Sequence, residues 1–388
     1  MQGGLLGLYI HVPFCLQKCA YCDFYSGPHA PEHMDAYLKA VTAHIREAAG
    51  FTRKYSVDTI YFGGGTPTLL GAKRLTDLLN TCRRVFNLTN NPEITIEANP
   101  GTVDPKLLKK LRKAGYNRLS IGVQSLDDNR LLELGRAHNA AQAQSAFDDA
   151  RDAGFDNISV DILYGLPDQS LDEWRHTLNE IIKWKPDHIS CYGLKLEEGT
   201  PLYDKRVVLN IPDDDAQADC YLAADELLTS AGFEHYEVSN FAAPSRASRH
   251  NMKYWTLQPY MGFGPSAHSD FDGRRYSIIP DLAAYIKGIA DGDEVLRDSE
   301  YIPEVERAGE YLMLNLRTSY GVSSNEYTRM FRASFETIEA DLARCEAHGL
   351  AVHSGDRWRL SPKGFLVSNA ILARILGVPI EKQSRHLE

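Results

Sequence analysis

Short apolar runs alternate with amphipathic stretches over the first 230 or so residues of the chain. The apolar runs are rich in Ile, Val and Tyr and predict β-strands, and the stretches between them predict helices that begin at Asp or Ser caps. Expected strands cover residues 7–12, 57–63, 93–99, 117–123, 157–165 and 188–194. Expected helices cover residues 32–50, 72–86, 104–115, a stretch from Asp127, and 171–184.

Six strand-then-helix units predict a parallel sheet of the α/β class. A complete barrel of this kind has eight units, so we expect residues 1–235 to form an open, partial (β/α)6 barrel of the TIM type. Residues 236–300, rich in aromatic residues, Gly, Pro and Ser, are expected to be a connecting segment of strand and loop draped over the barrel. Residues 301–380 are expected to form a smaller α+β domain similar to a winged helix, with a hairpin turn at Gly355-Asp356.

Composition and charge narrow the function classes. The formal net charge of the 388 residues is -10, which argues against nonspecific binding of nucleic acid. Residues 301–388 contain 11 Lys and Arg against 11 Asp and Glu. Because this region is neutral overall, we expect it to have a docking or covering role rather than to bind DNA. We see no signal peptide and no apolar run of about 18 residues, so we expect a cytoplasmic protein without stable membrane insertion.

The strongest candidate chemistry is a C-x3-C-x2-C run formed by Cys15, Cys19 and Cys22. Three thiolates on one loop can hold an iron–sulfur cubane by three of its irons, which leaves the fourth iron open to a small molecule. A zinc site is the alternative and would need a fourth ligand, such as His11 or His29. The remaining cysteines are scattered singly and read as buried free thiols rather than a disulfide framework (Cys82, Cys191, Cys220 and Cys345).

Polar and glycine residues follow five of the predicted strands. They are Gly63–Pro67, Glu97–Pro100, Gln124-Ser125, Asp161 and Tyr164–Pro167. Because the carboxyl ends of parallel strands meet at one mouth of a barrel, we expect these groups to converge there.

The cysteine run, with Tyr21 before its last Cys and "YIHVPF" ahead of it, resembles that of the radical S-adenosylmethionine (SAM) enzymes. In that superfamily the open iron of a [4Fe–4S] cluster chelates SAM, and one electron cleaves the sulfonium to give a 5′-deoxyadenosyl radical. The resemblance therefore implies a [4Fe–4S] cluster and SAM as cofactors, and an electron donor as a partner.

The same resemblance extends to the residues expected to hold SAM. "GGGTP" is similar to the glycine motif of the superfamily and implies that Gly64, Gly65 and Thr66 contact the methionyl part, because glycine lets backbone approach a ligand. A carboxylate suits the ribose hydroxyls or the ammonium of SAM, and an Arg suits its carboxylate. The implied polar contacts are Glu97, Gln124, Arg136 and Asp161, and the implied aromatic positions near the cluster and the adenine are Tyr9 and Tyr21.

Within the superfamily, "LYIHVPFC", "YFGGGTPT", "NRLSIGVQS" and "VDILYGLP" resemble the oxygen-independent coproporphyrinogen III oxidase-like proteins. The true oxidases have a further Cys two residues after the last cluster ligand, where this chain has Phe24. They also have an extension ahead of the first strand, whereas this chain begins almost at the strand. Both differences argue against oxidative decarboxylation of coproporphyrinogen III.

The segment "RHNMKYW" fits the H-N-x-x-Y-W signature of the haem chaperone branch, the HemW type, through His250, Asn251, Tyr254 and Trp255. The resemblance implies that the protein binds haem and passes it to acceptor haemoproteins. An imidazole can ligate haem iron, and Tyr and Trp offer flat apolar surface to a porphyrin. His11 and His268 are alternative iron ligands.

Other functions stay open at this point. The chain can be an oxygen-independent coproporphyrinogen III dehydrogenase, a radical enzyme that modifies haem, or a cluster-bearing regulator. Whether SAM is cleaved productively and whether the protein forms a homodimer are also open.

Overall fold

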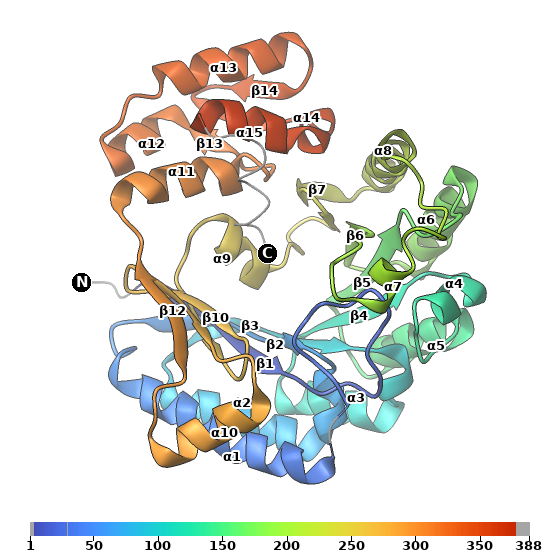
Figure 1. The fold of residues 1–388 in the computed structure, drawn as a ribbon, viewed down its shortest axis with the longest axis vertical. Helices are drawn as coiled ribbons and strands as arrows, with labels where there is room; N and C mark the ends of the chain where they lie inside the picture. Colours follow the sequence, from blue (N-terminus) through green and yellow to red (C-terminus); the bar gives the residue numbers. More distant parts are fainter. Residues whose placement is uncertain (1–3, 29, 378–388) are drawn as a thin grey trace.

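Six parallel strands form the centre of the molecule (Figure 1). The computed structural model describes residues 4–28 and 30–377 of the chain. Neighbouring strands of the six pair in chain order and in parallel, as predicted. They are β1 (Leu5–Val12), β2 (Ser56–Gly64), β3 (Leu88–Ala98), β4 (Arg118–Gln124), β5 (Ile158–Tyr164) and β6 (His188–Gly193).

Helices cover the outer face of this sheet (Figure 1). They are α1 (Pro31–Glu47), α2 (Gly71–Val85), α3 (Pro105–Ala114), α4 (Asp128–Glu133), α5 (Ala140–Asp152) and α6 (Leu171–Trp184). Side-chain caps fix where they begin: Asp104 accepts a hydrogen bond from the backbone N–H of Leu107, and Ser170 accepts one from that of Glu173. The stretch from Asp127 holds two helices rather than one, because Asn139 caps a second start.

Strands from later in the chain extend the sheet at both edges. Among the described residues the sheet has 12 strands in the order β12-β11-β10-β9-β1-β2-β3-β4-β5-β6-β8-β7, so it does not close into a barrel. The predicted connecting segment therefore supplies sheet strands on both sides rather than only covering the barrel. The added strands are β7 (Glu234–Glu237), β8 (Asn240–Ala242), β9 (Tyr260–Phe263), β10 (His268–Phe271), β11 (Arg274–Ile278) and β12 (Leu296–Tyr301).

Four further helices accompany these strands: α7 (Pro201–Asp204), α8 (Asp214–Ser230), α9 (Arg249–Trp255) and α10 (Leu282–Asp291). In Figure 1, α9 lies on the inner side of the sheet, opposite α1 and α2. No helix in the described part of the chain is long and apolar enough to span a bilayer.

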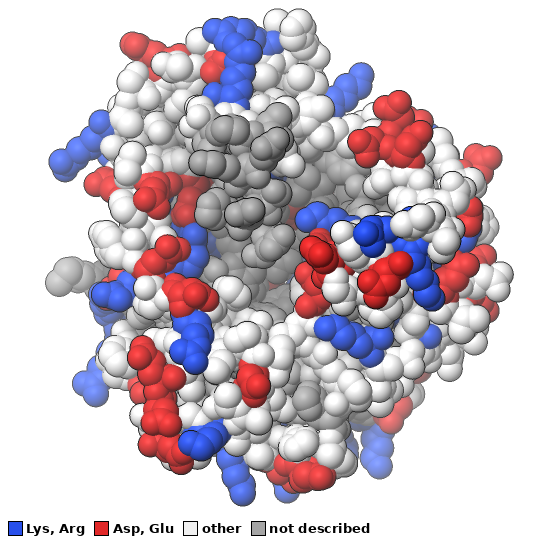
Figure 2. Space-filling model, in the orientation of Figure 1, with Lys and Arg blue, Asp and Glu red and all other residues white. Residues whose placement is uncertain are grey.

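The C-terminal region is a small α+β domain with its own apolar core. Its elements are α11 (Glu304–Asn315), β13 (Val322–Ser323), α12 (Ser324–Phe331), α13 (Glu336–Ala347), β14 (Ala351–Ser354), β15 (Arg357–Leu360), α14 (Pro362–Leu366) and α15 (Ser368–Leu376). Two pairs of charged groups, Arg307 with Asp270 and Arg275 with Glu310, join α11 to β10 and β11. Figure 2 shows basic and acidic side chains interspersed over the face of both domains.

Candidate functional site

The three cysteines lie on the loop that follows β1, and all three border one cavity of about 410 Å³. The loop is closed by backbone hydrogen bonds, from the N–H of Cys15 to the carbonyl of Gly27 and from the N–H of Gly27 to the carbonyl of Pro13. The thiols are free and half-buried. The predicted trio is thus assembled at one mouth of the sheet.

Neighbouring side chains donate hydrogen bonds to two of the cysteine sulfurs. Arg136 donates to Cys19 Sγ at 3.4 Å, and the hydroxyl of Thr66 donates to Cys15 Sγ at 3.7 Å. Asn99 in turn donates to the Thr66 hydroxyl at 2.7 Å. Donors of this kind stabilise thiolates, which are the form that binds metal.

The donor set fits a cubane better than a single zinc ion. Among residues 4–28 and 30–377, no three His, Cys, Asp or Glu side chains are placed to hold one metal ion. In a cubane each thiolate binds a different iron, so the three sulfurs need not converge on one point. His11 is no fourth ligand here, because its Nε2 donates to the carbonyl of Tyr25 at 2.8 Å and its Nδ1 accepts from Tyr9 at 3.1 Å. His29 lies outside the described residues.

The predicted polar contacts at the strand ends meet in the same cavity. Glu97 comes from β3, Gln124 from β4, Asp161 from β5, and Arg136 follows α4; all four line it. Arg136 also donates to the carbonyl of Gly122 at 2.6 Å, which fixes its side chain between β4 and the cysteine loop.

The glycines of the GGGTP motif are needed for the packing of the chain itself, in addition to any contact with a ligand. A Cβ on Gly65 would lie 2.6 Å from the carbonyl oxygen of Phe14 and 2.9 Å from that of Val12. Gly64 has φ +105°, and its N–H donates to Glu97 at 3.1 Å. Glycine is therefore required where the turn after β2 packs against the cysteine loop. Thr66 borders Cys15 and does not line the main cavity.

Glu97 and Asp161 have different surroundings. Burial raises the pKa of Glu97 to about 7, although the hydroxyl of Tyr61 donates to it at 2.8 Å. Asp161 accepts hydrogen bonds from the hydroxyls of three serines: Ser120 at 2.8 Å, Ser159 at 3.0 Å and Ser190 at 2.6 Å. Glu97 is thus able to hold a proton near neutral pH, whereas the lone pairs of Asp161 accept hydrogen bonds from hydroxyl groups.

The two predicted tyrosines are placed differently. Tyr21 lines the cavity beside Arg136. Tyr9 does not line it; its ring packs beside those of Tyr61 and His250, with centroids 6.1 and 6.5 Å away. Tyr9 is therefore a packing partner of α9 in this structure.

The H-N-x-x-Y-W signature forms α9, and only Asn251 of its four residues lines the cavity. His250 is 1% exposed, and both ring nitrogens are hydrogen-bonded: Nδ1 to the hydroxyl of Thr59 and Nε2 to that of Tyr254, each at 2.8 Å. Burial lowers the pKa of His250 to about 3. The structure thus leaves His250 no nitrogen for haem iron. Trp255 is half-buried outside the cavity.

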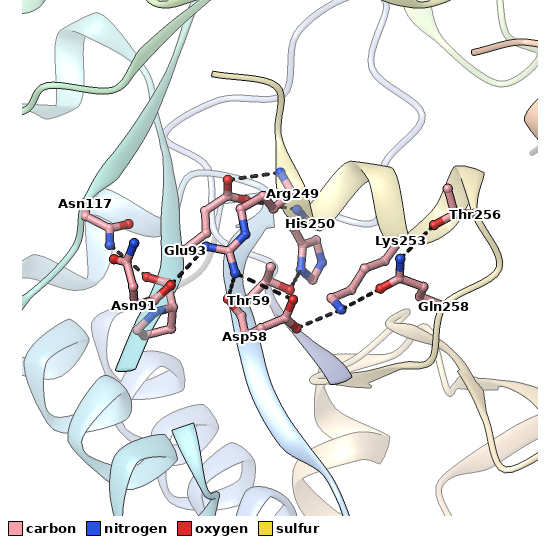
Figure 3. A network of polar contacts seen from close by, with 11 residues as sticks. Asp58, Thr59, Asn91, Glu93, Asn117, Arg249, His250, Lys253, Thr256 and Gln258 are labelled. Atoms are coloured by element: carbon pink, nitrogen blue, oxygen red, sulfur yellow. Dashed lines mark hydrogen bonds and ion pairs between the residues drawn. The ribbon is translucent and has the colours of Figure 1, made fainter. Parts of the chain in front are cut away.

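A network of charged groups holds α9 against the sheet (Figure 3). Glu93 on β3 accepts hydrogen bonds from the backbone N–H groups of Arg249 and His250 at the start of the helix. Lys253, 1% exposed, lies 2.7 Å from Asp58 on β2. Neither alternative haem ligand lines the cavity: His11 has both ring nitrogens in hydrogen bonds, and His268 is exposed on β10.

Several residues that line the cavity were not predicted. They are Tyr61, Arg118, Ser120, Ser190 and Tyr192, among others. A signal for them exists in the sequence: Arg118, Ser120, Gly122 and Gln124 alternate along β4, and alternate residues of a strand share a face. Once Gln124 is placed in the site, the alternation points to the other three.

Comparison with known proteins gives the following matches. A model described as the radical SAM superfamily matches residues 9–181, and a model described as the HemN C-terminal domain matches residues 302–367. A protein of Bacillus subtilis named "Heme chaperone HemW" is 34% identical over 376 residues, with 95% of this chain and 98% of that protein covered. A protein of the same name from Escherichia coli K12 is 34% identical over 380 residues, with 96% and 98% covered.

A more distant relative comes from Danio rerio, the "Radical S-adenosyl methionine domain-containing protein 1, mitochondrial", at 32% identity with 95% of this chain and 86% of the relative covered. Among solved structures, coproporphyrinogen III oxidase (HemN) from Escherichia coli superimposes with a TM-score of 0.84 at 22% identity, over 96% of this chain and 90% of the other. At that identity the likeness shows a shared fold.

Proposed function

The chain belongs to the HemW family of radical SAM proteins, and we propose that it is a haem chaperone that carries a [4Fe–4S] cluster, binds SAM and haem, and transfers haem to acceptor haemoproteins. The observation that carries the proposal is the set of three thiols at the mouth of one polar cavity, in a chain that matches curated haem chaperones over nearly its whole length.

Cys15, Cys19 and Cys22 would hold three irons of the cluster. Such a cluster supplies one electron, from an external donor, for reductive cleavage of the SAM sulfonium. Arg136 would bind the carboxylate of SAM, because its guanidinium already lies between Cys19 and the backbone of β4. Glu97, Gln124 and Asp161 would orient the remaining polar groups of SAM, and Tyr21 and the Gly64-Gly65 turn would border it.

Haem is proposed to approach the mouth of the same cavity. Phe24 is 64% exposed and Tyr192 is 39% exposed, and both border the cavity. Aromatic rings in this position offer apolar area to a porphyrin face. Phe24 stands where the oxidases have a further Cys, so this rim is apolar where theirs has a thiol.

The role we propose for the H-N-x-x-Y-W helix differs from iron ligation by His250. His250 and Tyr254 fix α9 on the sheet, and Asn251 is the residue that the helix presents to the cavity. We therefore expect His250→Ala to weaken haem binding without changing the position of the Soret band. A shift of that band would identify His250 as the iron ligand after all.

The function is tested with anaerobically reconstituted protein. Iron and acid-labile sulfide are measured for the wild type, for Cys19→Ser, and for Cys345→Ser as a matched control, because Cys345 lies in the C-terminal domain. We expect loss of the cluster only in Cys19→Ser. Haem is then titrated, and its transfer to apomyoglobin is followed by the Soret band.

The competing enzyme function is tested in the same material. Reconstituted protein is incubated with SAM, dithionite and coproporphyrinogen III, and the products are separated by chromatography. Decarboxylated porphyrinogen would overturn the chaperone proposal in favour of a dehydrogenase. Absence of haem binding by the wild type would overturn it as well.

A further inference from the structure

Arg118 is a buried cation at the inner end of the cavity. It is the first residue of β4, and with Ser120, Gly122 and Gln124 it forms the face of that strand that lines the cavity. Its side chain is 1% exposed. Gln124 lies at the end of the cavity near the cysteines. Arg118 is six residues earlier on the same strand, which is roughly 20 Å away along β4.

The guanidinium has no hydrogen-bond partner in the described part of the chain. Its Nε is buried without one, and no ion pair joins it to a described carboxylate, although the charges of Glu93 and Asp161 attract it through space and raise the pKa of Arg118. A buried charge without a paired group is costly, so proteins rarely retain one without a partner or a ligand. Arg118 therefore differs from Lys253, the other fully buried cation of this region, which is paired with Asp58.

The carboxylates that interact electrostatically with Arg118 are hydrogen-bonded to other groups. Glu93 caps α9 through two backbone N–H groups, and Asp161 accepts from three serine hydroxyls. Glu97 accepts from Tyr61 and from the backbone of Gly64. These groups act on Arg118 only through space, so its planar fork of donors stays available to a ligand.

A second donor set lies in the same cavity. Asn251 lines it from α9, and its side-chain amide makes no hydrogen bond to a described residue. Arg118 lines the same cavity from β4. Both a guanidinium and an amide N–H can donate to a carboxylate, and the guanidinium can do so with two parallel hydrogen bonds.

We propose that Arg118 anchors a carboxylate of the ligand that occupies this cavity. The proposal rests on the proposed function, which supplies two sources of that chemistry: a propionate of haem and the carboxylate of SAM. A singly charged carboxylate fits better than a phosphate, because the carboxylate of Asp161 would repel a dianion more strongly. Haem is the source that we favour, because Arg136 beside the cysteines already suits the carboxylate of SAM. Since Arg118 lies at the inner end of the cavity, haem would enter with a propionate leading and its opposite edge between the rings at the rim.

The test compares haem with haem dimethyl ester, in which both propionates are blocked. Dissociation constants are measured for the wild type, Arg118→Gln, Arg118→Lys, and the control Arg175→Gln, whose guanidinium pairs with Glu226 outside the cavity. SAM affinity of each reconstituted protein is measured by equilibrium dialysis. Far-UV circular dichroism checks that each variant is folded.

We expect the wild type to bind haem at least tenfold more tightly than the ester. Arg118→Gln should lose about 10- to 100-fold in affinity for haem and almost nothing for the ester. Arg118→Lys should fall between, and Arg175→Gln should match the wild type. A loss confined to SAM would support the anchor and assign it to the carboxylate of SAM.

Equal losses for haem and ester, without a change in SAM binding, would mean that Arg118 is structural and would overturn the proposal. A wild type with no preference for haem over its ester, together with an unchanged SAM affinity in Arg118→Gln, would overturn it too. Failure of the wild type to bind either form of haem would instead count against the proposed function, and the SAM measurement would still decide on Arg118.

Discussion

Lys253 offers a direct test of how α9 is held on the sheet (Figure 3). Its ammonium group is buried 2.7 Å from Asp58 and donates to Gln258 at 3.2 Å. The Asp58 contact is ionic rather than a well-aligned hydrogen bond. Lys253→Met keeps the aliphatic stem and removes the charge, which leaves Asp58 buried with Arg249 at 3.6 Å as its remaining cation.

The expected loss follows from burial. Removing one partner of a buried ion pair costs about 3–5 kcal/mol, because the other charge remains desolvated. Arg249 offsets no more than about 1 kcal/mol, since its side chain is 46% exposed. We therefore expect Lys253→Met to lower the free energy of unfolding by about 3 kcal/mol, which moves a urea midpoint by about 1 M at a slope of about 3 kcal/mol/M.

Urea unfolding followed by far-UV circular dichroism measures this loss. The double variant Asp58→Asn with Lys253→Met should return to within about 1 kcal/mol of the wild type, because no buried charge is left unpaired. Lys287→Met is the control: it breaks a pair with Asp291 whose side chains are 74% and 51% exposed, and it should leave the urea midpoint unchanged. The reasoning fails if Lys253→Met behaves like the control, or if the double variant loses the sum of the single losses.

Three further predictions concern the site and the pH dependence. Gly65→Ala should displace the cysteine loop, because its Cβ would meet the carbonyl of Phe14 at 2.6 Å; we expect a lower iron content after reconstitution, and a wild-type content would contradict this. Arg136→Met should weaken SAM binding about 10- to 100-fold in equilibrium dialysis, with unchanged binding as the contrary result. The pKa of His250 is lowered to about 3 by burial, so the unfolded chain takes up a proton near pH 6.5 that the folded chain does not, and stability falls as pH falls from about 6.5 towards 3. His250→Asn should reduce that slope by about 1.4 kcal/mol per pH unit in urea unfolding, and an identical slope would refute the assignment.

Much of the fold could be predicted because parallel strands buried on both faces appear in sequence as continuous apolar runs. β4 is buried along almost its whole length, and its predicted bounds differ from the observed ones by one residue. The edge strands were harder to predict because they are short and partly polar. β9 has four residues and pairs with β1, some 250 residues earlier in the chain, and no local pattern reports such a pairing.

The site was predictable where function coincides with a strand end. Glu97, Gln124 and Asp161 were found because they end apolar runs, and all three line the cavity. Tyr61 and Arg118 were missed because they do not follow the end of an apolar run: Tyr61 lies within β2, and Arg118 is the first residue of β4. His250 shows the opposite problem: its residue type suggests an iron ligand, and only the tertiary structure shows that both nitrogens are in use.

The placement of α9 changes how a loss of haem binding should be interpreted. A Cβ on Gly7 would lie 2.8 Å from the Lys253 side chain and 3.3 Å from the His250 ring, so β1 has room for α9 only because it carries glycine there. The same strand leads directly into the cysteine loop, so the positions of α9 and of the cluster ligands both depend on β1. A variant of His250 can therefore move Asn251 relative to the cysteines and weaken haem binding without having touched the iron. Reduced affinity alone cannot identify an iron ligand in this motif; a changed ligand-field spectrum at full occupancy is needed.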